Sequence, residues 1–490
     1  MEFEAPTFNL LLILPVLIIV LWAMILMIVD LVLPADKKKW IAWLTLVGIV
    51  LALVQSIGLW DYNGGTFTPV GGLPMIAVDN YSIVIDVIIL VTAFMTVLIS
   101  INYLKKADID RPEFYYLMLF SVSGMMLMGM ANDLIVVFLA LELLSIPLYV
   151  LAGFARPRAE SEESAMKYFL LGAFASSFLV FGIALIYGAT GSTALPVVLD
   201  DIGNEPFLGG LGAALILVGL AFKIAAVPFH MWTPDVYEGA PTAVTAFMSV
   251  GAKVAGFAAL IRILLYALPN LSDTWIPVVA ILSALTMLVG NFVALAQRNI
   301  KRMLAYSSIA HAGFILMGVA AAVNSGKGIP AALFYLFAYL FTNLGAFAVV
   351  MAVERQDGEG LTLDDYKGLS KRHLWLALAL AFFMLSLTGI PPTGGFTAKF
   401  AVFGAAIEAD LVWLTIIGVL TSIVSAYFYL RVVFYSFMFD GEGEVIIKPA
   451  AAIAVAAAVV ATFLLGIFPT PWMDFAREAV FSTVQTIAGG

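Results

Sequence analysis

Apolar runs long enough to cross a membrane follow one another along nearly the whole chain of 490 residues. A hydrocarbon core about 30 Å thick needs roughly 20 apolar residues per helix, and the sequence offers about fourteen such runs. Hydrophobic residues make up 63% of the chain and charged residues only 12%, more apolar surface than a soluble fold needs. Because a backbone in lipid must satisfy its own hydrogen bonds, the sequence predicts an all-α polytopic protein embedded in a lipid bilayer.

The spans are expected near residues 8–33, 39–60, 79–103, 113–130, 133–155, 163–189, 208–229, 241–268, 275–297, 302–323, 328–353, 373–407, 410–438 and 447–469. Basic residues test this count, because Lys and Arg concentrate in cytoplasmic loops. Nearly all loop Lys and Arg fall on one side, and only Lys327 and Arg477 on the other. We therefore expect a multi-pass protein of the bacterial cytoplasmic (inner) membrane with both termini on the outer, periplasmic side. Arg262, near an outer helix end, is expected to reach the interface with its long stem.

The chain contains no cysteine, so it cannot form disulfides, hold an iron–sulfur cluster through thiolates or present a catalytic thiol. Its three histidines, His230, His311 and His373, are scattered over separate spans or loops without a nearby cluster of acids. This pattern predicts no metal site. No phosphate-binding loop is present, and the net charge of −9 gives no reason to expect nucleic-acid binding.

Four ionisable residues lie deep inside apolar runs: Glu142, Lys223, Lys253 and Lys399. A charge at the centre of a membrane helix costs on the order of 2.5–3.5 kcal/mol, so each one needs a reason. In a structural interpretation, Glu142 pairs with one lysine and the set only holds helices together. In a functional interpretation, the row carries protons, because burial and neighbouring charges bring such groups close to changing charge near neutral pH. Three lysines against one acid leave at least two without a carboxylate partner, which favours the proton path.

His311 lies in the middle of a span, in YSSIAHAGFILMG, beside Tyr306, Ser307 and Ser308. Two interpretations remain open for it. It is either a neutral core histidine that a neighbouring helix satisfies, or a relay that passes protons between the lysines.

Two of the charged spans contain helix breaks. Lys223 is followed by Pro228, and Lys399 comes at the end of GIPPTGGFTAK, residues 389–399. Proline interrupts a helix, and non-helical backbone at membrane depth is tolerated only inside protein or beside a wet cavity. Two such breaks suggest two inverted five-helix repeats, each with a broken helix. We therefore divide the chain into residues 1–112 with three spans, repeats at 113–268 and 269–440, and a last span with a short tail at 441–490.

Three segments carry a resemblance to a known family. AFKIAAVPFHMWTPDVYEGAPTAVTAFMSVGAKVAGF (221–257), NIKRMLAYSSIAHAGFILMG (299–318) and LTGIPPTGGFTAKF (387–400) resemble subunit N of respiratory complex I, the proton-pumping NADH-quinone oxidoreductase. Subunit N is one of the antiporter-like subunits, which are related to components of cation/proton antiporters. The resemblance covers nearly the whole chain.

The resemblance implies proton translocation through a buried Glu/Lys chain, driven by quinone reduction in other subunits. In such proteins a glutamate on the fifth helix pairs with a lysine on the broken seventh, a second lysine lies on the eighth, and a basic residue lies on the broken twelfth. Glu142, Lys223, Lys253 and Lys399 fill those places. The implied partners are sister antiporter-like subunits, small membrane subunits and a peripheral redox arm, and the FMN, iron–sulfur clusters and quinone site would lie in those chains.

Two alternatives remain. A cation/proton antiporter subunit would need several cation-binding oxygens at mid-depth, and Glu142 alone offers few. A passive scaffold that only transmits conformational force within the same complex is harder to separate, since buried charges can act as switches without carrying protons.

Overall fold

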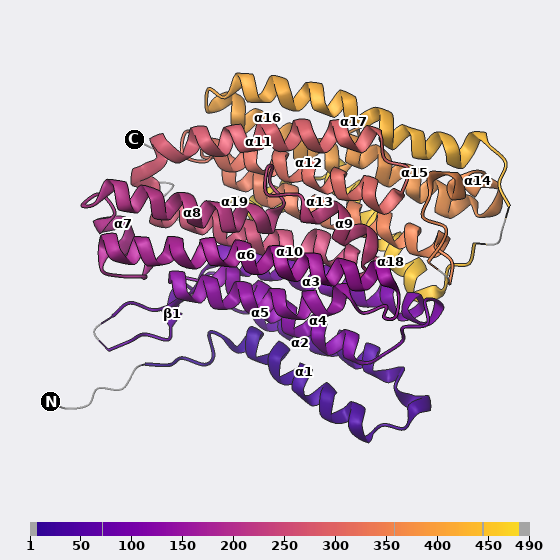
Figure 1. Cartoon of the computed structure of the whole chain (residues 1–490), viewed down its shortest axis with the longest axis horizontal. Helices are drawn as coiled ribbons and strands as arrows, with labels where there is room; N and C mark the ends of the chain where they lie inside the picture. Colours follow the sequence, from indigo (N-terminus) through magenta and orange to yellow (C-terminus); the bar gives the residue numbers. More distant parts are fainter. Residues whose placement is uncertain (1–6, 71, 357, 443–444, 480–490) are drawn as a thin grey trace.

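The computed structural model of the chain describes residues 7–70, 72–356, 358–442 and 445–479 (Figure 1). Its helices are α1 Leu14–Val32, α2 Trp40–Ile57, α3 Asn80–Lys106, α4 Glu113–Met130, α5 Leu134–Ala152, α6 Ala159–Thr190, α7 Leu195–Asp201, α8 Pro206–Ile224, α9 Trp232–Gly239, α10 Thr242–Arg262, α11 Ser272–Leu295, α12 Ile300–Ala321, α13 Gly328–Val353, α14 Leu369–Arg372, α15 Leu374–Thr388, α16 Gly394–Glu408, α17 Val412–Met438, α18 Pro449–Ile467 and α19 Thr470–Arg477. Short helical turns cover Ala35–Lys37, Ile263–Ala267, Pro269–Leu271 and Leu363–Tyr366.

The predicted all-α polytopic fold is confirmed. Within the described residues, 13 helices are long and apolar enough to cross a membrane. The fourteenth expected span, 373–407, consists of α15 and α16, each of which is too short to cross alone. A small antiparallel hairpin, β1 Gly64–Thr66 and β2 Ile76–Val78, lies in the loop between α2 and α3 and was not expected.

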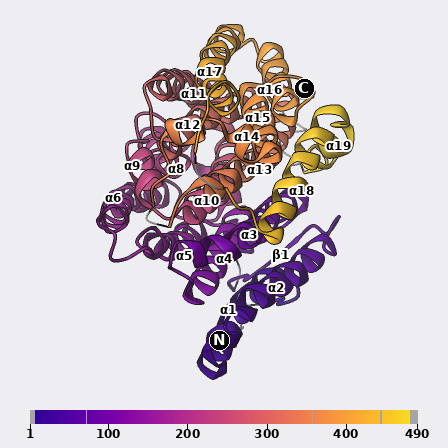
Figure 2. The ribbon, with the colours of Figure 1, turned by 90° about the vertical axis from the view of Figure 1, so that its right-hand side faces the viewer.

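The long helices lie side by side in one bundle, which Figure 2 shows nearly end-on, with α10 near its middle and α1 and α2 at one edge. Burial follows the same order. In the segment from α10 to residue 267, every residue of the most apolar stretch is buried, and in α12, α13 and α3 nearly every one is. In α1, α17 and α18 only about a third of the residues in that stretch, or fewer, are buried. The central helices therefore provide the dry interior in which a buried charge is costly.

Several helices begin at a residue whose side chain caps them. Asp79 accepts a hydrogen bond from the backbone N–H of Ser82 at 2.8 Å, and Asp133 accepts one from Ile135 at 2.8 Å. Asn299 does the same at the start of α12. Such caps satisfy N–H groups that the first turn of a helix leaves free.

Both predicted helix breaks are present. The first separates α8 from α9, and the Phe222 carbonyl freed by it accepts a hydrogen bond from Trp232 Nε1 at 2.9 Å. The second separates α15 from α16, where Thr393 caps the new helix. The inversion of two five-helix repeats and the division at residues 112, 268 and 440 stay predictions.

The expectation that Arg262 reaches the membrane interface is wrong. Its side chain is 2% exposed, and its guanidinium forms two hydrogen bonds of 2.9 Å to the carboxylate of Asp79. It also donates to the carbonyl of Gly129 at 2.8 Å and 3.0 Å. Helices α3 and α4 pack against this end of α10 and enclose it, so the arginine pairs with a carboxylate inside the protein.

Helices α4 and α5 approach each other closely at Gly124. A Cβ atom there would lie 2.4 Å from the backbone nitrogen of Leu144 and 2.8 Å from the carbonyl oxygen of Ala140. Because backbone cannot swing aside as a flexible side chain does, we expect Gly124→Ala to lower the free energy of unfolding by about 1–3 kcal/mol. Thermal unfolding in detergent measures this. Gly210→Ala on α8 is the control, since a Cβ there meets nothing within 4 Å; equal midpoints for the two variants would contradict the packing argument.

Candidate functional site

The four charged residues singled out from the sequence, here called the charged row, lie inside the bundle. Lys223 is 4% exposed, Lys253 2% and Lys399 4%, while Glu142 is half-buried. They come from four different places in the chain, namely α5, the end of α8, the middle of α10 and α16. Their order in space follows from the contacts of each ammonium group.

Lys223 lies in the last turn of α8, directly before the first helix break. Its Nζ donates to Ser145 Oγ at 2.7 Å and to Tyr168 Oη at 3.2 Å. The Tyr168 ring stacks on Trp232, with centroids 4.6 Å apart, and thereby connects both sides of the break. Because carbonyl groups at a helix C-terminus carry partial negative charge, this position favours an ammonium ion.

Glu142 and Lys223 are neighbours but not a direct pair. Among the described residues no ion pair joins them, because Ser176 donates to Glu142 at 2.5 Å while Ser145 accepts from Lys223. The pairing that the family resemblance implies therefore stays a prediction. A cavity of about 10 Å³ is lined by Ser145, Ser176 and Lys223. That is close to the smallest space that holds one water molecule, and its walls include both Lys223 and Ser176, the hydrogen-bond partner of Glu142.

Lys253 lies one helix further into the bundle. Its Nζ donates to both the carbonyl oxygen and the hydroxyl of Ser308, the latter at 2.6 Å, and lies 5.7 Å from the centre of the Tyr339 ring. Gly256, one turn along α10, lets Lys223 approach, since a Cβ there would lie 3.4 Å from Lys223 Cγ. Lys223 of α8 therefore packs against the face of α10 that carries Lys253, about one turn further along α10.

Lys399 connects the two halves of the second broken helix. Its Nζ donates to the carbonyl of Thr388, the last residue of α15, at 2.8 Å and to Ser422 Oγ at 2.8 Å. Gly389 begins the break with φ +91°, and a Cβ there would lie 2.9 Å from Lys399 Cδ. Only glycine combines this backbone conformation with so close an approach. Like Lys223, Lys399 thus lies against the C-terminus of a half-helix.

His311 stands between Lys253 and Lys399. Its Nδ1 is 2.7 Å from Tyr335 Oη, and its Nε2 is 3.2 Å from Tyr429 Oη. The Tyr339 ring that faces Lys253 lies 5.1 Å from the imidazole. On the other side, the Phe314 ring lies 6.1 Å from the imidazole and 4.8 Å from Lys399 Nζ. Both ring nitrogens are satisfied, as in a core histidine, and the ring also lies where a relay would have to be.

The sequence did not single out most partners of the charged row. Ser145, Tyr168 and Ser176 carry hydroxyl groups that contact the charged row, and Tyr335 and Tyr429 carry those that contact His311. One signal was present, because Ser145 follows Glu142 by three residues and shares its helix face. The other four lie far away in sequence, and only packing brings them to the row.

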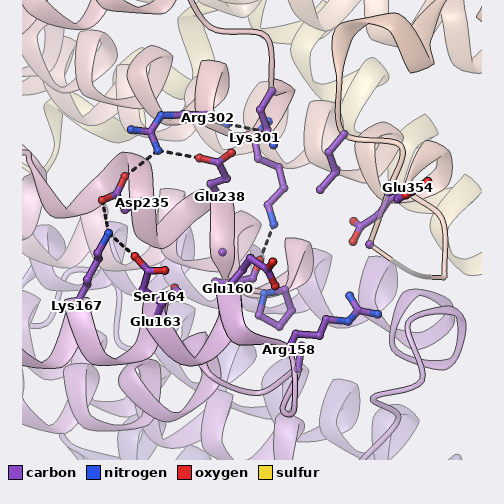
Figure 3. A pocket seen from close by; sticks show the side chains of 18 of the residues that line it. Arg158, Glu160, Glu163, Ser164, Lys167, Asp235, Glu238, Lys301, Arg302 and Glu354 are labelled. Atoms are coloured by element: carbon purple, nitrogen blue, oxygen red, sulfur yellow. Dashed lines mark hydrogen bonds and ion pairs between the residues drawn. The ribbon is translucent and has the colours of Figure 1, made fainter.

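A pocket of about 500 Å³ opens at the end of the bundle that carries most loop arginines and lysines, here called the basic side. Figure 3 shows its walls, where Lys167 bridges Glu163 and Asp235, and Arg302 bridges Asp235 and Glu238, each at 2.7 Å. Burial alone would raise the pKa of Asp235, but the hydrogen bonds from Lys167 and Arg302 hold it below its usual value. The pocket is a polar, charged vestibule beside the first helix break.

Comparison with known proteins gives a consistent result. The family model described as NADH:quinone oxidoreductase/Mrp antiporter, TM, matches residues 131–425. The chain is 46% identical to NADH-quinone oxidoreductase subunit N of Chloroflexus aggregans, over 95% of this chain and 96% of that one. It is 45% identical to subunit N of Trichlorobacter lovleyi, over 97% of both.

Solved structures agree. A chain of respiratory complex I from Thermus thermophilus superposes with a TM-score of 0.80 at 37% identity, covering 94% of this chain and 98% of that chain. A chain of the Mrp complex from Dietzia superposes with a TM-score of 0.86 at 21% identity, covering 98% of this chain and 100% of that chain, and so shares the fold.

Proposed function

Because this chain belongs to the subunit N family of NADH-quinone oxidoreductases, within the antiporter-like membrane subunits, we propose that it moves protons across the membrane through the charged row. It is a multi-pass membrane subunit of that enzyme complex and assembles with other membrane subunits. In the proposal, quinone reduction in partner chains supplies the free energy, and this chain supplies the path.

One observation carries the proposal. The three buried lysines and His311 follow one another across the centre of the bundle: Lys223 packs against α10 one turn from Lys253, and aromatic rings lie between Lys253, His311 and Lys399. In the part of the chain that the structure describes, their hydrogen-bond partners are hydroxyl and carbonyl groups and not carboxylates. Purely structural ammonium groups would be expected to find counter-charges, since an unpaired buried charge is strongly destabilising.

The first step depends on the gap between Glu142 and Lys223. At an effective dielectric constant of 20, closing a carboxylate–ammonium distance from about 8 Å to 4 Å strengthens the attraction by about 2 kcal/mol. A change of 1.36 kcal/mol alters proton affinity tenfold. When Glu142 approaches, Lys223 holds its proton; when Glu142 withdraws, Lys223 releases it toward the neutral amine of Lys253.

From Lys253 the proton passes toward Lys399. His311 accepts it at one ring nitrogen and releases a proton from the other, while Tyr335 and Tyr429 keep the ring in position. Lys399 then releases the proton to the side opposite the basic side. Because each step transfers a proton between an amine, an imidazole and water, no redox group is required in this chain.

We propose that the redox chemistry of the complex lies outside this chain. FMN, iron–sulfur clusters and the quinone site belong to partner chains, which include sister antiporter-like subunits, small membrane subunits and a peripheral redox arm. The chain lies in a bacterial cytoplasmic (inner) membrane, its basic side faces the cytoplasm, and both termini face the periplasm.

A cation/proton antiporter is the second candidate, and the likeness to the Mrp complex supports it only at the level of the fold. The cavity beside Glu142 is lined by hydroxyls, apolar groups and Lys223, whereas a sodium site needs several oxygen ligands and no ammonium group. Sodium-stimulated proton flux through the isolated chain would favour the antiporter.

Glu142→Gln tests the proposal. The amide still accepts a hydrogen bond from Ser176 but carries no charge to modulate Lys223. In membrane vesicles with the assembled complex, we expect the translocated protons per NADH to fall because the proton flux through this chain drops roughly tenfold, the equivalent of 1.36 kcal/mol. Glu113→Gln, at an exposed position on α4, is the control. Wild-type coupling in Glu142→Gln would remove this residue from the path.

A further inference from the structure

The deep end of the pocket on the basic side holds two charged side chains that the path above does not use. Lys301 is 2% exposed and Glu354 is 3% exposed, and both line the pocket. Figure 3 shows them beyond the network of ion pairs around Asp235. Their hydrogen-bond partners are neutral, as Lys301 Nζ donates to the carbonyl of Ala240 at 2.6 Å.

Glu354 follows the last residue of α13 and is held at the first residue of α10. Thr242 Oγ1 donates to Glu354 Oε2 at 2.6 Å, and Tyr103 Oη donates to Oε1 at 3.1 Å. The same tyrosine oxygen accepts the backbone N–H of Thr242 at 3.0 Å. A carboxylate at a helix N-terminus is favoured by the partial positive charge there, so Glu354 is fixed where α10 begins.

The surroundings of Glu354 suit a group that gains and loses a proton. Burial raises the pKa of Glu354, while the charge of Lys301 and the two hydroxyl hydrogen bonds oppose that rise. The charged and titratable groups that face it are Lys106, Arg158, Lys301, Tyr103 and Tyr366. Glu354 is therefore a buried carboxyl group of the pocket whose hydrogen-bond partners are hydroxyls and whose charged neighbours are three cations.

Polar side chains recur between Glu354 and Lys253 along the facing sides of α10 and α13, here called the polar seam. Asn343 Nδ2 on α13 donates to Ser249 Oγ on α10 at 2.6 Å, and the Tyr339 ring on α13 faces Lys253. Residues 242, 249 and 253 share one helix face. With a rise of 1.5 Å per residue, the seam from Thr242 to Lys253 is about 16 Å long.

The seam has polar atoms that the protein itself does not satisfy. In the described residues, Asn343 Oδ1 and Tyr339 Oη are buried without a hydrogen-bond partner. Buried polar atoms are nearly always bonded to protein or to ordered water, and leaving one unsatisfied costs about 1–3 kcal/mol. Since the two residues are one turn apart on α13, they mark adjacent positions for water between the pocket and Lys253.

We propose that Glu354 is the proton-loading carboxyl of this chain, which takes protons from the pocket and delivers them along the polar seam to Lys253. This inference rests on the proposed function, because Glu354 would return a proton to Lys253 after Lys253 has passed its own proton along the path. It assigns the uptake of protons to a point about three helix turns along α10 from Lys253.

Each transfer balances without a further reactant. A hydronium ion in the pocket gives its proton to the Glu354 carboxylate, which becomes a carboxylic acid and leaves a water molecule. The proton of the acid then moves along water and the Ser249 hydroxyl to the neutral amine of Lys253, forming an ammonium ion. Glu354 returns to the carboxylate, and only O–H and N–H bonds have formed or broken.

The test compares proton uptake in the assembled complex carrying Glu354→Gln, Glu354→Asp or Glu160→Gln. Glu160 is an exposed carboxylate on the same pocket and serves as the control. We expect Glu354→Gln to slow time-resolved proton uptake into this chain from the basic side by about 100-fold or more, since loss of a proton-transfer group costs about 10²–10⁴ in rate. Glu354→Asp should recover part of the rate, and Glu160→Gln should match the wild type.

The outcomes separate this inference from the proposed function. If Glu354→Gln takes up protons at the wild-type rate while Lys253→Met does not, the inference fails and the proposed function stands. If Lys253→Met also behaves as the wild type, both fail. Slow uptake in Glu354→Gln and in Lys253→Met, with partial recovery in Glu354→Asp, supports both.

Water in the seam is tested separately, because the chain has no cysteine of its own. A cysteine introduced as Ser249→Cys should react with the small, water-soluble reagent aminoethyl methanethiosulfonate applied from the basic side. Val250→Cys, the adjacent and equally buried position, points to another helix face and should stay unmodified. Equal labelling of the two, or none at Ser249→Cys, would overturn the seam as a path for water.

Discussion

Replacing Lys253 with methionine in the assembled complex should stop proton movement through this chain. Methionine fills a similar volume, and because no carboxylate contacts Lys253 in the described residues, its removal leaves no uncompensated buried charge behind. The Ser308 hydroxyl that Lys253 contacts can turn to its own helix. Because Lys253 is the only amine between Lys223 and His311 in the path, we expect the proton flux through this chain to fall about 100-fold or more.

The measurement is the initial rate of acidification in vesicles, normalised to NADH oxidation. Lys39→Met removes an ammonium group from an exposed position and is the matched control. It should pump as the wild type does. If Lys253→Met acidifies the vesicles at the control rate, protons do not pass through Lys253, and the scaffold interpretation gains support.

Lys399→Met should produce a different defect of similar size. Lys399 is the last amine of the row, and its partners are Thr388 and Ser422. Without it, protons can still be loaded on the basic side but find no group that releases them on the other. We therefore expect release to slow about 100-fold or more, while the first proton uptake after quinone reduction stays close to normal.

Dyes on the two sides of the vesicle membrane separate these events. Lys371→Met, at an exposed ion pair with Asp440, is the control. Release at the control rate from Lys399→Met would show that protons leave the chain by another route. Loss of uptake and release together would instead place Lys399 before the point of loading, contrary to the proposed order from Lys253 through His311 to Lys399.

The sequence alone predicted those parts of the site that depend only on the residues next to them in the chain. A lysine inside a long apolar run is expensive wherever that run lies, so Lys223, Lys253 and Lys399 could be recognised without knowing their neighbours. The same holds for the breaks at Pro228 and at residues 389–395, because proline and glycine act on the backbone directly. The all-α fold followed from the same apolar runs.

The parts that the sequence did not show depend on packing between distant segments. Glu354 and Arg262 lie at helix ends, where charged residues are usually solvated, and only neighbouring helices make them buried. The sequence also could not show that Lys223 and Glu142 each have a serine partner, Ser145 and Ser176. The position of His311 between two lysines likewise results from rings on α12 and α13, which no spacing in the sequence predicts.

Buried ammonium groups that gain and lose protons are what the whole mechanism requires. The number of protons translocated per electron pair reaching quinone tests this most directly, measured in vesicles with the wild-type chain and with Lys253→Met in otherwise identical complexes. The account predicts that the ratio falls in the variant while quinone reduction continues. An unchanged ratio at an unchanged rate of quinone reduction would contradict it.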